Sequence, residues 1–539
     1  PFHYQSSMVA AESLRSSFEM ALSLPTMFSG LLGLLLMCLV WWLLELLWWK
    51  PRRLERVLRA QGLTGTSYHF LTGDLKVEKQ LKKEALSRPL PLRCHDIVLR
   101  ILPFHYQNVQ AHGKTCLSWS GPIPTVAMCD PGLVKEMLSD KLGYFGKPQF
   151  PAVGEMLGNG LAQQEGDKWA QHRKVINPAF SLQEIKHTTP AFSSCCEEMV
   201  SRWAECLRRE GGTYCEVDVW PELSKLSGDA ISRTAFSSSY LEGRRVFQLQ
   251  SEQVKRLVST FLTILVPGYL YLPTENNRKM HQIKKEIEST LRGIIGKRVQ
   301  EMEDGITTKQ DILGLLLESN MMKVEEKGKP CPAMTIEEII EHCKVFYFAG
   351  SETTAILLTW TMVLLSMHPE WQVSARKEVL GLFGKNKPKY EDLSGLKTVT
   401  MILHEVLRLY PPVTLFKRKT YKEAKIGGVR YPAGVMVDIP VLLIHHDPDI
   451  WGSNVHEFHP ERFAEGVAKA SKFQGAFLPF SSGPRICIGQ NFAMVEAKIA
   501  LCMILQHFEF ELAPTYTHAP HVLLTLEPMH GAQINLRAI

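Results

Sequence analysis

The stretch Phe480-Ser-Ser-Gly-Pro-Arg-Ile-Cys-Ile-Gly489 decides the fold of this chain of 539 residues. Its one cysteine, Cys487, lies between Gly483 and Gly489, and glycines so placed allow a tight loop whose backbone N–H groups turn toward one sulfur atom. Such donors, together with the charge of a metal, hold a cysteine as the thiolate, which is the form that ligates metals. The pattern therefore predicts that Cys487 is a metal ligand.

The neighbours of Cys487 indicate what kind of metal group the loop receives. Gly489 has no side chain that would keep a flat macrocycle away, and we expect a helix to start directly after it. Phe480 can cover the thiolate, which limits the access of water and tunes the potential of an iron ion. The alternative is a buried free cysteine in a glycine-rich turn, but the whole spacing agrees with an iron ligand.

The composition limits the classes of protein to which the chain can belong. Apolar residues make up 45% of the chain and the formal net charge is +6, so a large core is possible and nucleic-acid binding gains no support. The 12 cysteines form neither a disulfide framework nor the CxxC pairs of a zinc site, which favours a reducing compartment.

A nearly unbroken apolar run over residues 28–49 predicts a membrane-spanning helix, since about 20 such residues cross a bilayer core. Lys50, Arg52 and Arg53 follow at once, so the positive-inside rule places the rest of the chain in the cytoplasm. A cleaved signal peptide is the alternative, but no small-residue cleavage site follows. We therefore expect a transmembrane signal anchor over residues 27–49.

Two segments flank this anchor. Residues 1–26 precede Met27, which starts the anchor sequence, and the motif PFHYQ at residues 1–5 recurs at residues 103–107. We hypothesise that this leader is a translation or gene-model extension. Residues 50–90 are basic and amphipathic, so we expect a linker close to the membrane surface.

The remainder of the chain has the pattern of helices with a few short β-like runs. These runs lie at residues 115–118 and 125–128, near residues 429–437, and at residues 522–526. We therefore expect a mainly helical body with small sheets.

The longest helical pattern begins at Thr335, which forms a capping box with Glu338, and its apolar residues continue to Met367. A polar patch at residues 349–354 contains a glycine and interrupts this helix in the middle. Taken alone, the patch fits a packing notch with satisfied hydroxyl groups slightly better than a functional site.

A second helix is expected from Leu396 to Tyr410, before two prolines. Glu405 and Arg408 lie three residues apart on it, so both reach the same face. From the residues alone, they form an ordinary surface pair that contributes little stability.

The cysteine loop resembles the haem-binding loop of the cytochrome P-450 superfamily, and the resemblance runs from the anchor to the C-terminus. It implies a mainly α fold of the α+β kind, with a large helical domain and small β-sheets, preceded by one transmembrane helix. Residues 91–539 would form the haem-thiolate catalytic domain. The implied cofactor is haem b, with the thiolate of Cys487 as axial ligand to the iron.

The resemblance changes the interpretation of the Glu405–Arg408 pair. The two residues match the ExxR element of the family, and Arg462 belongs to the PERF element at residues 460–463. In the family these three side chains form a buried structural network, which is costly to break by the loss of one member.

The helix patch at residues 349–354 matches the oxygen-activating motif of the family. The resemblance implies that the helix opens locally at Gly350, above the haem, which gives dioxygen room. Glu352 and Thr353 would form the acid–alcohol pair that relays protons to dioxygen, so that cleavage of the O–O bond releases water.

Further residues are implied to bind the haem. Trp169 and Arg173, in the sequence WAQHR, resemble the WxxxR element, and with Arg485 they would contact haem propionates. Without the resemblance, Trp169 is interpreted as a core aromatic. Phe480, Gly483 and Gly489 complete the expected cofactor-binding set.

The stretches WWKPRRLERVLRAQGLTG, YHFLTGDLK and LIHHDPDIWG resemble the plant clan that includes secologanin synthase and triterpenoid oxidases. By analogy, substrate contacts would come from about residues 150–162, from residues 516–520, and from Phe346, Tyr347, Ala349, Val413, Thr414 and Leu415. Simple core packing is the alternative at each position. The apolar lining suggests a lipophilic, terpenoid-like plant metabolite that is held mainly by burial.

No flavin or nicotinamide fingerprint occurs in the chain, so its electrons must come from another protein. The family implies NADPH and a membrane-bound flavoprotein reductase, at the endoplasmic reticulum membrane with the catalytic domain in the cytosol. The leading prediction is a monooxygenase that uses O₂ to hydroxylate or oxidise its substrate. The alternatives are a haem-thiolate isomerase or dehydratase acting on a peroxide without O₂, and a non-catalytic haem- or lipid-binding scaffold.

Overall fold

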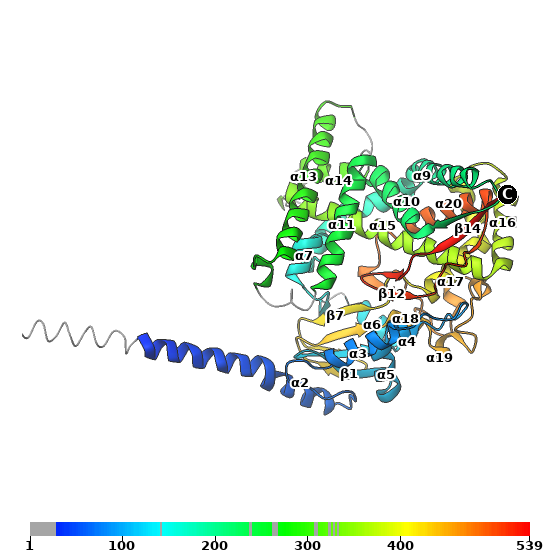
Figure 1. Cartoon of the computed structure of the whole chain (residues 1–539). Coiled ribbons are helices and arrows are strands. Elements are labelled where there is room, and N and C mark those ends of the chain that lie inside the picture. The colour runs from blue at the N-terminus through cyan, green and yellow to red at the C-terminus, as the bar shows by residue number, and fades with distance from the viewer. Residues whose placement is uncertain are drawn as a thin grey trace, which may run out of the picture.

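The computed structural model describes residues 28–140, 143–236, 240–260, 268–306, 311–321, 325–326, 329–330 and 334–539. The leader hypothesis for residues 1–26 lies outside these described residues. Helices make up most of the body and the strands form small sheets, as the sequence predicted (Figure 1).

The helices are α2 (Lys50–Arg59), α3 (Leu75–Leu86), α4 (Val98–Ile101), α5 (Pro103–His112), α6 (Pro131–Leu138), α7 (Pro151–Leu157), α8 (Gly166–Ile176), α9 (Leu182–Arg209), α10 (Val219–Ala235), α11 (Tyr240–Ser259), α13 (Glu275–Glu303), α14 (Ile312–Met321), α15 (Ile336–Met367), α16 (Pro369–Phe383), α17 (Lys397–Leu409), α18 (Val441–His445), α19 (Pro448–Trp451) and α20 (Gln490–His507).

The strands are β1 (Thr115–Ser120), β2 (Ile123–Met128), β3 (Phe145–Gly146), β4 (Cys215–Asp218), β5 (Glu325–Glu326), β6 (Lys329–Pro330), β7 (Phe416–Thr420), β8 (Ala424–Ile426), β9 (Val429–Tyr431), β10 (Met436–Ile439), β11 (Phe508–Leu512), β12 (Pro520–Val522), β13 (Leu526–Pro528) and β14 (Gln533–Ala538).

The largest sheet has the strand order β1-β2-β10-β7-β3. β1 and β2 pair antiparallel from Thr115 opposite Met128 to Ser120 opposite Ile123, and β10 joins β2 in parallel. This sheet lies at the end of the body from which the N-terminal helix projects, with most of the long helices beyond it (Figure 1). Each of the β-like runs that the sequence indicated overlaps a strand.

α15 forms the centre of the helical part. The Thr335 side chain accepts the Glu338 N–H at 3.2 Å, and the Glu338 carboxylate accepts the Thr335 N–H at 3.0 Å, so the predicted capping box is present. Most of the side chains after Ser351 are buried, because α15 packs against α10, α17 and α20. The elongated apolar pattern therefore belongs to a core helix.

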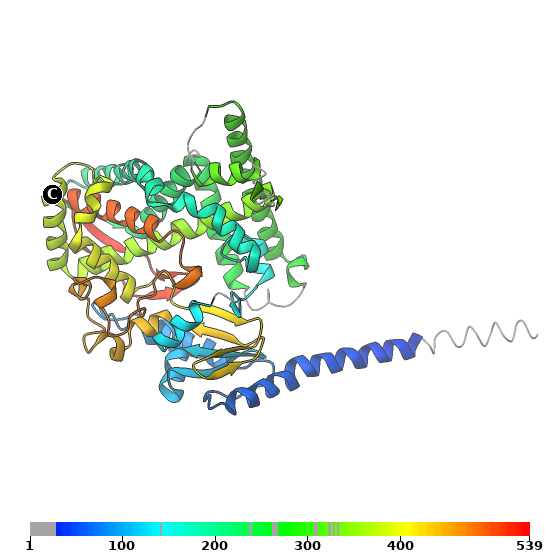
Figure 2. The same cartoon turned by 180° about the vertical axis from the view of Figure 1, so that it is seen from behind.

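In the part of the chain that the structure describes, two helices are long and apolar enough to cross a membrane. The apolar window of α15 is 72% buried, whereas none of the window in the helix Phe28–Arg59 is buried. The N-terminal helix extends away from the body in both views (Figures 1 and 2). Exposed apolar surface of this length is consistent with a membrane anchor.

The N-terminal helix continues through Pro51 to Arg59, so it extends into the segment predicted as a linker. Proline has no N–H and would leave the carbonyl four residues earlier without a helical donor. A π-helical turn at Glu45–Trp49 precedes Pro51, and the carbonyl of Leu47 accepts the hydroxyl of Tyr68 instead. This contact connects the helix to the chain that follows it.

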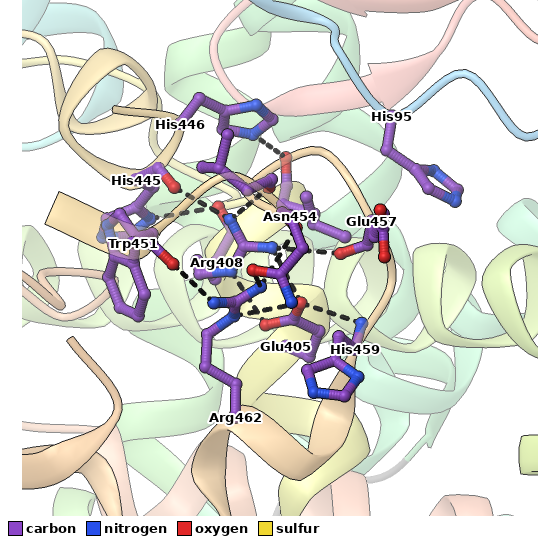
Figure 3. Close-up of polar contacts among 12 residues, drawn as sticks. His95, Glu405, Arg408, His445, His446, Trp451, Asn454, Glu457, His459 and Arg462 are labelled. Carbon is purple, nitrogen blue, oxygen red and sulfur yellow. Dashed lines mark hydrogen bonds and ion pairs between the residues drawn. The ribbon is translucent and has the colours of Figure 1, made fainter. Parts of the chain in front are cut away.

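Arg408, on α17, is completely buried, and each of its nitrogens donates a hydrogen bond (Figure 3). Nε and Nη2 donate to the two oxygens of Glu405 at 2.8 and 2.7 Å. Nη1 donates to the carbonyls of His445 and Val455 at 2.9 and 2.8 Å, and Nη2 also reaches the carbonyl of Glu457 at 3.3 Å. The buried charge is therefore fully surrounded by acceptors.

Arg462 lies beside this pair (Figure 3). Its Nη1 donates to the carbonyl of Trp451 at 2.7 Å, its Nη2 donates to Asn454, and its Nε lies 3.7 Å from Oε1 of Glu405. The three residues of the ExxR and PERF elements thus meet in one buried cluster, so the interpretation of the pair as a surface contact is wrong.

Glu405→Gln removes the negative charge at nearly constant shape and leaves the Arg408 charge buried without its partner. Loss of one member of such a pair costs about 3–5 kcal/mol, so we expect a clearly lower unfolding temperature by scanning calorimetry. Glu465→Gln is the matched control, because Glu465 pairs with Lys469 at 2.8 Å where both side chains are more than 70% exposed. Equal unfolding temperatures for the two variants would contradict the structural role.

Candidate functional site

A cavity of about 370 Å³ lies between α15 and the cysteine loop. The predicted site residues that line it are Trp169, Arg173, Phe346, Ala349, Gly350, Thr353, Val413, Phe480, Arg485, Cys487 and Gly489. They come from segments more than 300 residues apart in the chain. The fold therefore gathers most of the predicted positions around one space.

The cysteine loop owes its shape to Gly483. Its φ is +71°, which L side chains rarely adopt, and a Cβ here would lie 2.0 Å from the carbonyl oxygen of Leu138. The Cys487 N–H donates to the carbonyl of Phe480 at 2.9 Å and closes the loop. α20 then begins at Gln490, directly after Gly489, as expected.

Gly489 has a different role from Gly483. Its φ is −86°, so the backbone does not require a glycine there. A Cβ on Gly489 would lie 3.9 Å from the Cys487 sulfur, on the wall of the cavity. The missing side chain leaves space beside the sulfur, which is the space that a flat macrocycle ligated by Cys487 would need.

The Cys487 sulfur faces the cavity and is in an environment that acts on its charge in two directions. Burial raises the pKa of the Cys487 thiol, whereas a hydrogen bond from the Gly489 backbone and the charges of Arg173 and Lys147 lower it. A bound metal ion would add to the groups that favour the thiolate. The sulfur, its N–H donor and its nearby cations fit an iron ligand.

Four cationic side chains line one side of the cavity: Lys147, Arg173, Arg418 and Arg485. Arg485 Nη1 donates to the carbonyl of Gln164 at 2.8 Å, Nη2 pairs with Glu165, and the guanidinium stacks 3.9 Å over the Trp169 ring. Arg173 Nη1 donates to the carbonyl of Ile486 at 3.1 Å. Positive charge thus gathers around Trp169, Arg173 and Arg485, the residues that were expected to contact the haem propionates.

Burial and the neighbouring cations lower the pKa values of two of these four side chains. Burial, together with Arg418 and Arg485, lowers the pKa of Lys147 to about 8. Burial and Arg485 lower the pKa of Arg418 to about 10. Glu165 opposes both shifts, and two anionic carboxylates would relieve the remaining excess of positive charge, so the group fits a dianionic macrocycle.

Sequence reasoning missed Lys147 and Arg418. Arg418 occupies a buried position of β7, and a charged residue at an inward position of a strand is unusual enough to have been noticed. Lys147 follows β3 in a segment without a regular pattern, and no sequence signal marks it.

α15 forms the roof of the cavity, and it is helical without interruption through Gly350. The expected local opening at Gly350 is therefore not present. The Thr353 hydroxyl donates to the carbonyl of Ala349 at 2.8 Å, which keeps that turn regular. Gly350 instead permits close packing, because a Cβ there would lie 2.9 Å from the Ile231 side chain of α10.

Glu352 and Thr353 point in different directions. Thr353 lines the cavity, whereas Glu352 is half-buried and accepts a hydrogen bond from the Thr525 hydroxyl at 3.2 Å. Burial, and then repulsion by Glu527, raises the pKa of the Glu352 carboxyl, while Thr525 and Lys255 oppose the shift. Thr525 and Glu527 belong to the β12–β13 hairpin and were also missed from the sequence.

A family model described as "Cytochrome P450" matches residues 90–527. The chain belongs to the cytochrome P450 family. This membership confirms the predicted fold and the class of haem-thiolate monooxygenase, and it implies haem with a cysteine thiolate ligand. Oxygen and a redox partner are implied in the same way.

Several relatives match nearly the whole chain. Cytochrome P450 CYP72A616 of Paris polyphylla is 52% identical over 514 residues, which cover 95% of this chain and 99% of that protein. The 11-oxo-beta-amyrin 30-oxidase of Glycyrrhiza uralensis is 49% identical over 498 residues, which cover 92% of this chain and 94% of that protein. The chain is therefore a plant-type P450, as the resemblance indicated.

A solved structure, cyanobacterial CYP120A1 with bound retinoic acid, superposes with a TM-score of 0.70 at 21% identity. It covers 84% of this chain and 98% of its own. At this identity the likeness shows the fold alone.

Some of the predicted substrate contacts of this P450 line the cavity and others do not. Phe346, Ala349 and Val413 line the cavity, as do Leu161 and Ala162 from the segment before Trp169. These positions agree with the places expected by analogy.

Three predicted substrate contacts do not line the cavity, namely Tyr347, Thr414 and Leu415, and neither does the predicted turn at residues 516–520. Tyr347 is buried and stacks on Phe236 at 4.2 Å, because one residue along a helix turns the side chain by about 100° from Phe346. Thr414 is buried, with its carbonyl bound by the Leu442 N–H at 3.1 Å, and Leu415 is half-buried. In the turn at 516–520, the Tyr516 hydroxyl contacts His518 at 2.9 Å.

Gly483→Ala and Gly466→Ala form a matched pair of variants. Both glycines have positive φ, which costs an alanine about 1–3 kcal/mol, but an added Cβ has no neighbour within 4 Å at Gly466 and meets Leu138 at Gly483. We expect the Gly483 variant alone to lose most of its haem, measured as haem per chain after purification. Equal haem content in the two variants would contradict the assigned role of the Leu138 contact.

Proposed function

We propose that this P450 uses O₂ to hydroxylate or further oxidise a lipophilic plant metabolite of terpenoid type. The observation that carries the proposal is the cavity itself, in which the Cys487 sulfur faces an apolar roof from α15 and α10. Ile231, Phe346, Ala349 and Leu357 contribute to this roof. Such a surface holds a substrate mainly by burial, and the printed name of the Glycyrrhiza uralensis relative describes an oxidase of a β-amyrin derivative.

In this proposal the haem, when bound, supplies the activation of oxygen. Cys487 would ligate the iron through its thiolate, and Phe480 and the loop backbone would limit the access of water to that sulfur. Trp169, Arg173 and Arg485 would bind the propionates, and we add Lys147 and Arg418 to this proposed set because they also line the cavity.

We further propose that Glu352 and Thr353 deliver protons to the cavity. The raised pKa of Glu352 allows its carboxyl to hold a proton at a higher pH than a solvated glutamic acid does. To pass a proton on, Glu352 must rotate from Thr525 toward the cavity, and Thr353 must turn its hydroxyl from the Ala349 carbonyl.

The alternative activity, isomerisation or dehydration of a peroxide without O₂, requires no proton delivery. The presence of Glu352 and Thr353 therefore favours the monooxygenase. Oxygen consumption that depends on NADPH, a flavoprotein reductase and a terpenoid substrate distinguishes the two, and product formation from a peroxide alone would support the alternative.

We propose that residues 27–49 anchor the protein in the endoplasmic reticulum membrane, followed by a basic membrane-proximal segment to residue 90 and by a catalytic domain over residues 91–539 in the cytosol. At the end of the apolar run, Arg52 lies 4.6 Å from the Trp48 ring, and Arg53 pairs with Glu45. This pairing of tryptophan and arginine suits the cytoplasmic interface of a bilayer. A membrane-bound, NADPH-dependent reductase can then reach the same surface.

Cys487→Ala removes the proposed iron ligand. We expect the red-shifted Soret band of the reduced carbon monoxide complex to disappear in this variant. Cys206→Ala is the control, because Cys206 is a half-buried cysteine of α9 that does not line the cavity, and this variant should keep the band. A band that persists in the Cys487 variant would overturn the assignment of the ligand.

Thr353→Ala removes the proposed proton donor on the cavity wall. We expect haem and substrate binding to remain while product formation falls by roughly 10²-fold, the size of a general-acid contribution. The electrons would then leave as hydrogen peroxide and water, which is measured as NADPH consumed per product formed.

Thr359→Ala provides the control, because Thr359 also lies on α15 and donates to the carbonyl four residues earlier, at 2.7 Å, but is buried away from the cavity. It should keep the coupling of NADPH to product. If Thr353→Ala keeps this coupling too, Thr353 is not the proton donor.

A further inference from the structure

Three residues that could bind a metal ion lie close together, near the buried Arg408. Asp96 precedes α4, His446 follows α18, and His456 lies in the segment after α19. One ligand atom from each residue lies within 4.8 Å of the others, and His456 Nδ1 lies 3.8 Å from a carboxylate oxygen of Asp96. None of these residues belongs to the haem cavity or to the proposed reaction.

His446 presents an unpartnered nitrogen to this group. The residue is only 4% exposed, and its Nε2 lies 3.0 Å from the carbonyl of Leu409, which can only accept (Figure 3). Nε2 therefore carries the proton, and Nδ1 has a lone pair. No described residue makes a hydrogen bond to this Nδ1.

His456 has the same feature. Its Nδ1 is also buried and has no hydrogen-bond partner among the described residues, and its ring centre lies 5.5 Å from that of His446. Buried polar atoms nearly always have a partner, so two such nitrogens next to one carboxylate need an explanation.

From this geometry we propose that Asp96, His446 and His456 bind a zinc ion. Two imidazole nitrogens and one carboxylate oxygen are ligands that Zn²⁺ accepts, with water as a fourth ligand. The Leu409 carbonyl has the role of the partner that orients a metal-bound histidine through its other nitrogen. Bonds of about 2.0–2.1 Å to the metal require the half-exposed side chains of Asp96 and His456 to move inward.

The charges around these three residues act on a bound cation in both directions, because Arg408 opposes it and the Asp96 carboxylate attracts it. Arg408 is a buried cation that acts on His446, and its charge is balanced by both oxygens of Glu405. The Leu409 carbonyl fixes the proton of His446 on Nε2, so the lone pair of Nδ1 is available to a metal ion. The carboxylate of Asp96 contributes the negative charge.

The site would join distant parts of the chain. Val455, whose carbonyl binds Arg408, directly precedes His456, and the Leu409 carbonyl that binds His446 directly follows Arg408. Zinc would therefore connect Asp96 to the segment that surrounds the Arg408 charge. A ligand that binds only the folded chain stabilises it, so zinc should raise the unfolding temperature.

The test uses the full-length, haem-loaded protein without a polyhistidine tag, treated with a chelator and dialysed against Zn²⁺. We expect one zinc per haem iron, and zinc-edge X-ray absorption should show nitrogen and oxygen ligands with two imidazoles. A zinc ion held by sulfur, or no zinc retained, would overturn the proposal. Neither measurement depends on catalytic activity, so the result is independent of the proposed function.

Variants test the individual ligands. Asp96→Asn and His456→Ala should each weaken zinc binding by at least about 100-fold, since loss of a supporting partner alone costs 10–100-fold at metal sites. Zinc should raise the unfolding temperature of the parent protein but not of these variants. Haem content confirms that each variant is folded.

His459→Ala is the matched control. The His459 and His456 side chains are both 41% exposed, and each lies within 4.0 Å of one carboxylate, but only His456 faces a second, buried imidazole. His459→Ala should keep zinc affinity and the zinc-dependent stabilisation. Equal affinity in the His456 and His459 variants, whether both are unchanged or both reduced, would contradict the assigned ligands.

Discussion

The buried charge of Arg408 is the constraint on which the haem side of the molecule depends. Its acceptors are Glu405 and the carbonyls of His445, Val455 and Glu457, so the path of the chain from α18 to residue 457 is held around one guanidinium. Because an unpaired charge cannot be buried without a large cost, this segment has little freedom to rearrange.

His445 transmits the position of Arg408 to the cysteine loop. Its Nδ1 binds the Arg408 carbonyl at 3.2 Å, and its Nε2 accepts the Leu478 N–H at 2.9 Å, two residues before Phe480. Burial and Arg408 lower the pKa of His445 to about 3, which keeps the ring neutral and Nε2 an acceptor. The loop that presents Cys487 is thus held at its start by His445 and in its middle by the contact of Gly483 with Leu138.

The cavity has a cationic wall and an apolar roof, and these fit the carboxylate edge and the apolar ring of a haem. Lys147, Arg173, Arg418 and Arg485 make one wall cationic, whereas the roof from α15 and α10 is apolar. A flat apolar ring with two carboxylates at one edge would place that edge against the cationic wall. The lipophilic substrate that we propose would occupy the remaining space against the same apolar roof.

Much of this protein could be predicted from its sequence alone. The cysteine loop, the capping box at Thr335 and the runs of apolar residues are local patterns, and local patterns determine the helices, the tight turn and the family. The loop position of Cys487 was recognised from its local spacing, whereas the burial of Glu405 and Arg408 was expected only from the resemblance to the family, because their spacing alone indicates an ordinary surface pair. What local pattern does not contain is the direction of a side chain relative to distant elements.

Only the tertiary structure decided that Tyr347 packs on Phe236, that Glu352 reaches Thr525, and that Lys147 and Arg418 line the cavity together with Arg173 and Arg485. It also decided that α15 passes Gly350 without opening and that Asp96 meets two histidines some 350 residues away in the chain. Each of these outcomes depends on packing between segments far apart in sequence. Periodicity tells which residues share a helix face, but burial and electrostatics between elements determine what that face meets.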